Sequence, residues 1–242
     1  MVVDLSATTK NQKTYTLYLT NSIDLGLHNL MTCYDSAGTS FILGRKYLEI
    51  SRKYDKEIAR LGHQWNSCQS AGGIKYPKPS RHMLKVYKKK RNCIHDYLHK
   101  VTRAVVNYCK ANDIHTVIIG DITNIRRNKN LGKVTNQKLH ALPYAKIYGM
   151  LEYKLAMHGI TLAKQTEEYS SQCSPHAPQV TKEYAKKCNR TNRGLYKDQF
   201  SVYNADAVGA YNIMRKYFAG CGKEKKISVT GLSSPMIIKV AV

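Results

Sequence analysis

The stretch Thr116-Val117-Ile118-Ile119-Gly120-Asp121 decides the fold class. Its first four residues are apolar or β-branched, and an uninterrupted run of this kind is typical of a strand that is buried on both faces of a sheet. An acidic residue stands at the end of the run. We therefore expect a central strand that carries a carboxylate at its carboxyl end.

The segment before this strand predicts a β-meander. Residues 14–20 alternate apolar and polar side chains, which is the period of a half-buried strand. Residues 22–26, 30–34 and 40–43 continue the pattern, and a turn signal separates the last two at residues 35–38. We expect three strands, with Asp24 on the first full one.

A helical hairpin is expected at about residues 46–112. Apolar side chains recur every three or four residues from Tyr47 to Leu61, which predicts one helix. Residues 62–80 contain two adjacent glycines and two prolines, so we expect a loop there. A second helix, at about residues 80–112, has nearly heptad apolar spacing, which favours packing against the first helix.

The remaining elements complete an alternation of strands and helices. A helix is expected at residues 142–158 with Pro143 in its first turn, and a strand at residues 160–164. A lysine-rich stretch leads to a last helix that begins after Asn204. Such alternation predicts an α/β fold. The tail, residues 220–242, has no clear pattern.

Composition indicates a polyanionic partner. The 242 residues include 39 Lys and Arg but only 16 Asp and Glu, which gives a net charge of +23. Nucleic acid is the partner that such a charge favours, and an anionic membrane surface or a role in solubility alone are the weaker alternatives. No apolar run approaches the roughly 18 residues of a membrane span. The seven cysteines form no CxxC pair, and the start resembles no secretory signal, so we expect a reducing, cytoplasmic location.

Four acidic residues stand at conspicuous places in this basic chain: Asp24, Asp121, Glu167 and Asp206. Each alone also fits a turn or a helix cap. If the strands that carry them are neighbours, the carboxylates converge at one edge of the sheet. Converging carboxylates repel unless a cation compensates them, and Mg²⁺ or Mn²⁺ prefers oxygen ligands. The pattern therefore predicts a metal-dependent centre that hydrolyses phosphodiesters.

Several segments resemble the RuvC motifs of the TnpB family of transposon-encoded, RNA-guided nucleases, which are related to type V CRISPR effectors. Ser22 to Leu30, with the sequence SIDLGLHNL, resembles the first motif. Residues 117–126 look like the second motif, and residues 204–213 look like the third. Residues 168–173 are similar to the lead-in to the family's zinc-finger-like insert. The resemblance covers about residues 14–217.

This resemblance implies an RNase H-like fold and magnesium-dependent DNA cleavage that is guided by an RNA. Asp24 and Asp206 match the first and the last catalytic acid of the family. The usual pattern has Glu where this chain has Asp121. We favour Glu167 as the middle ligand, with Asp121 as an additional or alternative one.

The resemblance also implies a division of the chain. The nuclease domain is expected at residues 1–168 plus 204–219, and a target-nucleic-acid-binding insert at residues 169–203. A structural zinc ribbon needs four ligands, and the insert offers three candidates: Cys173, His176 and Cys188. We therefore expect no zinc there, and an insert that either folds as a metal-free hairpin or stays mobile.

TnpB proteins carry a guide-handling region before the first motif, whereas 23 residues precede Asp24 here. We expect a chain that lacks this lobe, with DNA as substrate and a guide RNA implied by the family. A second polypeptide could supply the lobe. A nucleic-acid-binding protein that does not cleave, or a truncated remnant, is the alternative.

Basic residues in three regions are candidates for contact with nucleic-acid backbones, because Lys and Arg neutralise phosphates. They lie on the second hairpin helix, after the central strand and in the insert, and a solvated surface is the other interpretation. The candidates are Lys88, Lys89, Lys90, Arg91, Arg126, Arg127, Lys129, Lys133, Lys138, Arg190 and Arg193.

Overall fold

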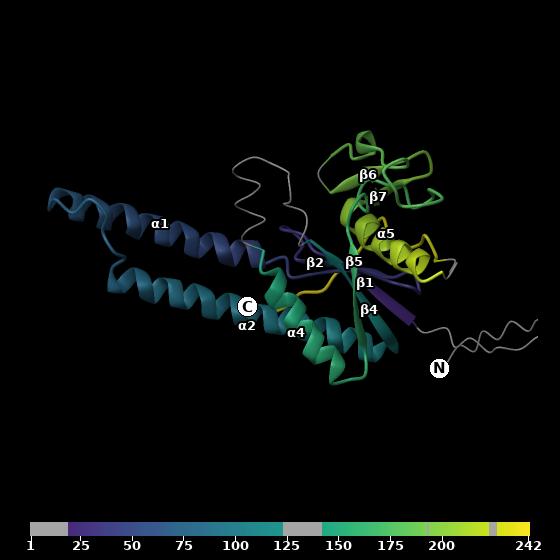
Figure 1. The fold of residues 1–242 in the computed structure, drawn as a ribbon, viewed down its shortest axis with the longest axis horizontal. Coiled ribbons are helices and arrows are strands. Elements are labelled where there is room, and N and C mark those ends of the chain that lie inside the picture. The colour runs from purple at the N-terminus through teal and green to yellow at the C-terminus, as the bar shows by residue number, and fades with distance from the viewer. Residues whose placement is uncertain (1–18, 123–141, 193, 223–226) are drawn as a thin grey trace, which may run out of the picture.

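Six strands form one mixed sheet in the order β5-β4-β1-β2-β3-β8 (Figure 1). The computed structural model describes residues 19–122, 142–192, 194–222 and 227–242. The strands are β1 (Leu19–Asp24), β2 (Met31–Asp35), β3 (Ser40–Leu43), β4 (Ile114–Asp121), β5 (Thr161–Thr166) and β8 (Met236–Ile237).

The predicted three-stranded meander with Asp24 on its first full strand is confirmed, while residues 14–18, where the predicted alternation begins, lie outside the described residues. β1 pairs antiparallel with β2, and β2 pairs antiparallel with β3. On its other side β1 pairs parallel with β4, and β4 pairs parallel with β5. Three neighbouring parallel strands therefore end at the same edge of the sheet, and this arrangement positions the site described below.

β4 lies between β5 and β1, and its side chains point alternately into two apolar cores. Val117 and Ile119 pack in the core with residues of the hairpin and α4, whereas Ile118 packs in the core with residues of α5. All three side chains are fully buried. The prediction of a strand that is buried on both faces is confirmed.

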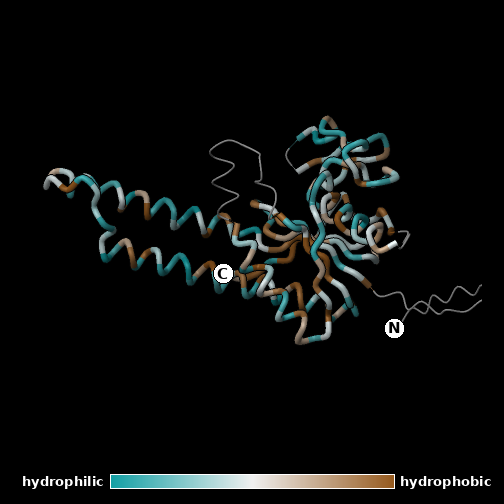
Figure 2. Tube along the Cα trace, in the orientation of Figure 1, coloured by the Kyte–Doolittle hydropathy of each residue, from teal (hydrophilic) through white to brown (hydrophobic). Residues whose placement is uncertain are grey.

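The hairpin consists of α1 (Tyr47–Ala71) and α2 (Arg81–Ala111), which lie side by side and extend away from the sheet (Figure 1). The prediction of a loop at residues 62–80 is wrong for residues 62–71, because α1 continues to Ala71. Trp65 lies on this added part, and its indole Nε1 donates to the carbonyl of Lys78 at 2.8 Å. Apolar residues gather near the sheet and at the base of the hairpin (Figure 2). α2 begins after Ser80, whose hydroxyl accepts from the Met83 amide.

The helix predicted at residues 142–158 is α4 (Tyr144–Ala156), and Pro143 is its N-cap rather than a residue of its first turn. Buried Lys154 joins α4 to α2, since its Nζ donates to the Thr102 hydroxyl at 2.7 Å and to the His99 carbonyl at 2.9 Å. None of the described helices is both long and apolar enough to span a membrane.

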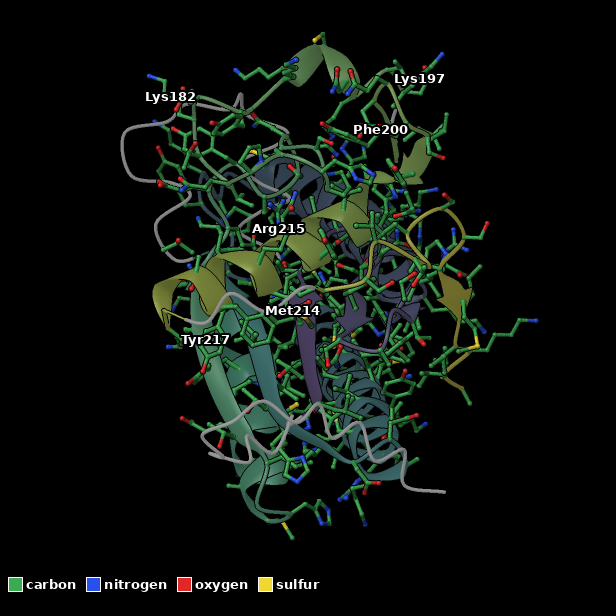
Figure 3. All side chains as sticks on the ribbon, turned by 90° about the vertical axis from the view of Figure 1, so that its right-hand side faces the viewer. Lys182, Lys197, Phe200, Met214, Arg215 and Tyr217 are labelled. Atoms are coloured by element: carbon green, nitrogen blue, oxygen red, sulfur yellow. The ribbon has the colours of Figure 1, made fainter. Side chains whose placement is uncertain are left out.

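The segment between β5 and α5 folds as a small layer on α5 (Ala205–Gly220). It contains the 3-10 turn η1 (Lys187–Asn189) and the antiparallel pair β6 (Leu195–Lys197) and β7 (Val202–Asn204). Two polar side chains of α5 hold it: the Asn212 amide donates to the Ser170 and Cys173 carbonyls, and Arg215 donates to the Ser174 carbonyl at 3.4 Å. Figure 3 shows this layer above α5, with Lys182, Lys197 and Phe200 in it.

Candidate active site

The carboxyl ends of three parallel strands bring three of the predicted acids to one edge. Asp24 is the last residue of β1, Asp121 is the last residue of β4, and Glu167 directly follows β5. The register pairs Ile23 with Ile119. In open α/β sheets this edge is where ligands bind.

Asp206 reaches the same edge from the first turn of α5. The Asn204 side chain caps the helix, because its Oδ1 accepts from the amides of Asp206 and Ala207 at 3.1 Å each. The Asn29 amide donates to Asp206 Oδ2 at 2.8 Å. Asn29 lies in the loop that follows Asp24, so this hydrogen bond joins the first and the third motif.

Two glycines make room for the acids. A Cβ at Gly209 would lie 2.5 Å from Asp24 Oδ2, and a Cβ at Gly120 would collide with the Glu167 carboxylate. Any larger residue at either position would displace a carboxylate. Asp24 therefore packs directly against the backbone of α5, and Glu167 packs against the end of β4.

Asp24 lies in an environment that disfavours its ionised form. Burial raises the pKa of Asp24 from 3.8 to about 7, and the neighbouring Asp206 carboxylate adds to the rise. Arg190, which comes from the insert, opposes it. Because repulsion from Asp206 reaches Asp24, these two acids of the first and the third motif share one environment.

The environment of Glu167 also disfavours the ionised form of its side chain. Burial raises the pKa of Glu167 well above its usual value, and the charges of Asp24 and Asp121 raise it further. The Leu25 amide, which donates to the carboxylate, and the Lys216 ammonium act in the opposite direction. Glu167 thus interacts electrostatically with the acids at the ends of β4 and β1.

The donor set fits a hard divalent cation. All four acids are partly exposed, so ligands can reach them. Glu167 Oε1 is buried and accepts no hydrogen bond, and a cation would satisfy such an oxygen. Among the described residues no three His, Cys, Asp or Glu side chains are drawn together closely enough to enclose an ion. Electrostatic interactions nevertheless link Asp24 to Asp206, and Glu167 to Asp24 and Asp121.

The three zinc candidates do not converge. Cys173 is buried, and its thiol donates to the Thr181 carbonyl at 3.3 Å. His176 hydrogen-bonds the Tyr203 hydroxyl through Nε2 at 3.0 Å, and Cys188 is exposed on η1.

A network around Asp198, which the sequence did not single out, holds this part of the insert. Asp198 Oδ2 accepts from the Ser174 hydroxyl at 2.6 Å, and Oδ1 accepts from the amides of Phe200 and Ser201. Burial works to raise the pKa of Asp198, but these hydrogen bonds outweigh it and hold the pKa below its usual value. The ring of His176 packs on Phe200, with centroids 4.3 Å apart.

The nucleic-acid candidates divide into two described groups. Arg190 is exposed in the insert and acts on Asp24 electrostatically. On α2, Lys88, Lys90 and Arg91 line a groove of about 670 Å³ together with Tyr87 and with Lys146 of α4. Lys90 also pairs with Asp55 of α1 at 2.5 Å, and Lys89 is exposed. The candidates Arg126, Arg127, Lys129, Lys133, Lys138 and Arg193 lie outside the described residues.

Sequence reasoning missed Asn29 and Lys216 as partners of the acids. Asn29 belongs to the SIDLGLHNL stretch, so its motif was the available signal. Lys216 donates to Thr166 Oγ1 and to the Glu168 carbonyl across 50 and 48 residues of chain, and no local pattern marks such a contact.

Comparison with known families agrees with the geometry. The family model described as "OrfB_IS605: Probable transposase" matches residues 5–126. The chain belongs to this family. A second model, "Cas12f1-like, TNB domain", matches residues 144–213. The resemblance to TnpB is thereby confirmed.

A curated relative extends the comparison. "Putative RNA-guided DNA endonuclease InsQ" of Escherichia coli (strain K12) is 26% identical over 213 residues, which cover 83% of this chain and 50% of that protein. This OrfB_IS605 member therefore spans about half the length of the relative.

Solved structures of Cas12 effectors share the fold. A cryo-EM structure of a Cas12f1-sgRNA-target DNA complex superposes with a TM-score of 0.59 and 16% identity, over 81% of this chain and 49% of that chain. A CRISPR-Cas12f ternary complex gives 0.57 and 15%, over 81% and 38%. The predicted α/β class, with a mixed sheet and flanking helices, is confirmed.

Proposed function

We propose that this OrfB_IS605 protein is a metal-dependent endonuclease that hydrolyses DNA phosphodiesters. One observation carries the proposal: Asp24, Asp121 and Glu167 end three neighbouring parallel strands, and α5 brings Asp206 to Asp24. An acidic edge inside a chain of net charge +23 suits a polyanionic substrate that is cut at a cation site.

Asp24, Glu167 and Asp206 would hold Mg²⁺ or Mn²⁺, with Asp121 as an additional or alternative ligand. When bound, the cation would compensate the carboxylates, polarise the phosphodiester and lower the pKa of the attacking water. Asn29 orients Asp206 through its hydrogen bond. Lys216 and the Leu25 amide favour the ionised form of Glu167, which is the form that binds a cation.

Basic side chains would hold the substrate strand. Arg190, close enough to Asp24 to lower its pKa, would contact a phosphate next to the acidic edge. The groove of Lys88, Lys90, Arg91 and Lys146 offers further phosphate contacts, and the exposed ring of Tyr87 offers a stacking surface for an unpaired base.

An RNA partner is part of the proposal. The curated relative is described as RNA-guided, and the Cas12f1 structure contains an sgRNA and target DNA. By analogy we propose that an RNA directs this chain to its DNA. A second polypeptide that completes the guide-handling region stays a prediction.

The test is cleavage of labelled single-stranded DNA with Mg²⁺ or Mn²⁺, with and without RNA transcribed from the flanks of the gene. We expect the parent to cut and Asp24→Asn to cut at least about a hundredfold more slowly. Asp113→Asn, an exposed Asp outside the site, is the matched control and should cut like the parent.

The second candidate function is nucleic-acid binding without cleavage. Two observations favour it. Among the described residues, no three acidic, His or Cys side chains lie close enough together to hold an ion. In addition, Asp121 stands where the family pattern has Glu. Salt-sensitive DNA binding by a parent that cuts neither with nor without RNA would select this candidate over the nuclease.

A further inference from the structure

The C-terminal segment 227–238, which showed no sequence pattern, is anchored to the sheet by hydrogen bonds. The Tyr34 hydroxyl of β2 donates to the Ser228 carbonyl, and the Ser40 hydroxyl of β3 donates to the Gly231 carbonyl. Leu232 is 1% exposed in the core that α5 covers. A tail with a fully buried leucine is a packed part of the fold.

Gly231 marks the tightest contact of this segment. It has φ +72°, and a Cβ there would collide with the carbonyl oxygen of Gly38 in the turn between β2 and β3. The two backbones therefore approach as only a glycine allows. Any side chain at position 231 would push the segment off the turn.

The next residues reach the helix that carries Asp206. The amide of Asn204 donates to the Leu232 carbonyl at 2.9 Å, and the Ser233 hydroxyl donates to the Val202 carbonyl at 2.9 Å. Asn204 is the N-cap whose side chain accepts from the Asp206 amide. The segment thus fixes the backbone of the residue that caps the first turn of α5.

Beyond this contact the segment returns to the main sheet. β8 pairs parallel with β3, and the Ile238 amide donates to the Ile42 carbonyl at 3.0 Å. The segment that binds the N-cap of α5 through Leu232 is therefore attached to the β2–β3 hairpin both before and after Leu232. β2 pairs directly with β1, the strand that ends in Asp24.

We propose that residues 227–238 are a positioning strap: Gly231 and Leu232 hold the N-cap of α5 and so hold Asp206 in place beside Asp24. The value of this placement for catalysis rests on the proposed function. The strap itself does not, because its contacts can be tested in the metal-free protein.

Hydrogen exchange on the full chain, without metal, tests the strap. Gly231→Ala is compared with Gly222→Ala, a matched control with φ +64° and open space where the Cβ would lie. Both variants strain a left-handed glycine, but only the first breaks the approach to Gly38. We expect the Asp206 and Ala207 amides to exchange about tenfold faster in Gly231→Ala than in Gly222→Ala.

Amides of α2 between Val101 and Val106 report whether the whole molecule has loosened. If they also exchange faster in Gly231→Ala, Ser233→Ala is used, since it removes only the hydrogen bond to Val202. Equal exchange of the α5 amides in Gly231→Ala, Ser233→Ala and Gly222→Ala overturns the strap.

Mn²⁺ affinity, measured on the same samples, separates the strap from the proposed function. If the parent binds Mn²⁺ and Gly231→Ala binds it about tenfold more weakly, the result supports both the strap and the proposed metal centre. A parent that binds no Mn²⁺ refutes the proposed metal centre, while the exchange result still decides the strap.

Discussion

Asp24 ends a strand whose preceding residues are buried, and it shares a confined edge with Asp206 and Glu167. Burial and mutual repulsion raise the pKa values of Asp24 and Glu167, so ionising these two groups at this edge is unfavourable. A divalent cation bound there, as proposed above, would compensate the charge.

The first prediction concerns pH. Because the folded pKa of Asp24 lies near 7 and the unfolded value near 3.8, this group contributes full stability below about pH 4 and loses it as the pH rises through about 7. We expect the metal-free parent to lose roughly 2–4 kcal/mol more between pH 4 and pH 8 than Asp24→Asn does. Urea unfolding across this range measures the difference, and parallel pH profiles would contradict the assignment.

The second prediction separates two adjacent glutamates. Glu167 packs at the acidic edge, whereas Glu168 is exposed. Glu167→Gln should slow metal-dependent cleavage at least about a hundredfold, and Glu168→Gln should leave it within about twofold. If Glu167→Gln cleaves at the parent rate and Asp121→Asn loses cleavage, Asp121 is the middle ligand instead.

The sequence singled out the four acids because each follows an apolar strand or opens a helix, and their role in cation binding stays a prediction. It could not predict that the charges of Arg190 and Lys216 act on Asp24 and Glu167, because these residues are far apart in the chain and leave no local pattern.

Among the elements, strands β2 to β5 and helix α2 were predicted closely, whereas α1 was predicted too short and β8 was not predicted. The sequence of residues 62–71 gives few apolar positions, and these residues are mostly exposed or half-buried in the hairpin. The Trp65 indole donates a hydrogen bond to the Lys78 carbonyl across the end of the hairpin, and apolar periodicity does not reveal such a contact. The tail escaped prediction for the same reason, since its partners are distant strands.

The third prediction concerns the insert. Asp198 gathers Ser174, Phe200 and Ser201 by hydrogen bonds, so we expect Asp198→Ala to open this region and to speed trypsin cleavage in it about fivefold. Gln199→Ala, an exposed neighbour, should not change the rate. A chelator should leave the parent rate unchanged; a parent that is cut faster with chelator would indicate a structural metal.

The whole molecule combines a small acidic edge with a strongly basic surface and a long projecting hairpin (Figure 1). Both apolar cores include residues of β4, with α5 in one core and the hairpin and α4 in the other. Composition predicted the basic surface and a nucleic-acid partner. The groove between α1, α2 and α4 appears only when the three helices are assembled.

The fourth prediction tests this groove. Replacing Lys88 and Arg91 together by Gln should weaken binding of single-stranded DNA about tenfold and lower the slope of log affinity against log salt by about two. Lys75→Gln with Lys78→Gln removes the same charge from the loop at the far end of the hairpin. Equal losses in the two double variants would mean that charge, and not the groove, governs binding.

Calorimetric titration of the purified, chelator-treated protein with Mn²⁺ tests whether the acids at the parallel-strand edge form one cation site. We expect that the parent binds Mn²⁺, that Asp113→Asn binds equally well, and that Asp24→Asn loses at least about tenfold in affinity. Equal binding by the parent and Asp24→Asn, or no binding by the parent, would contradict this expectation.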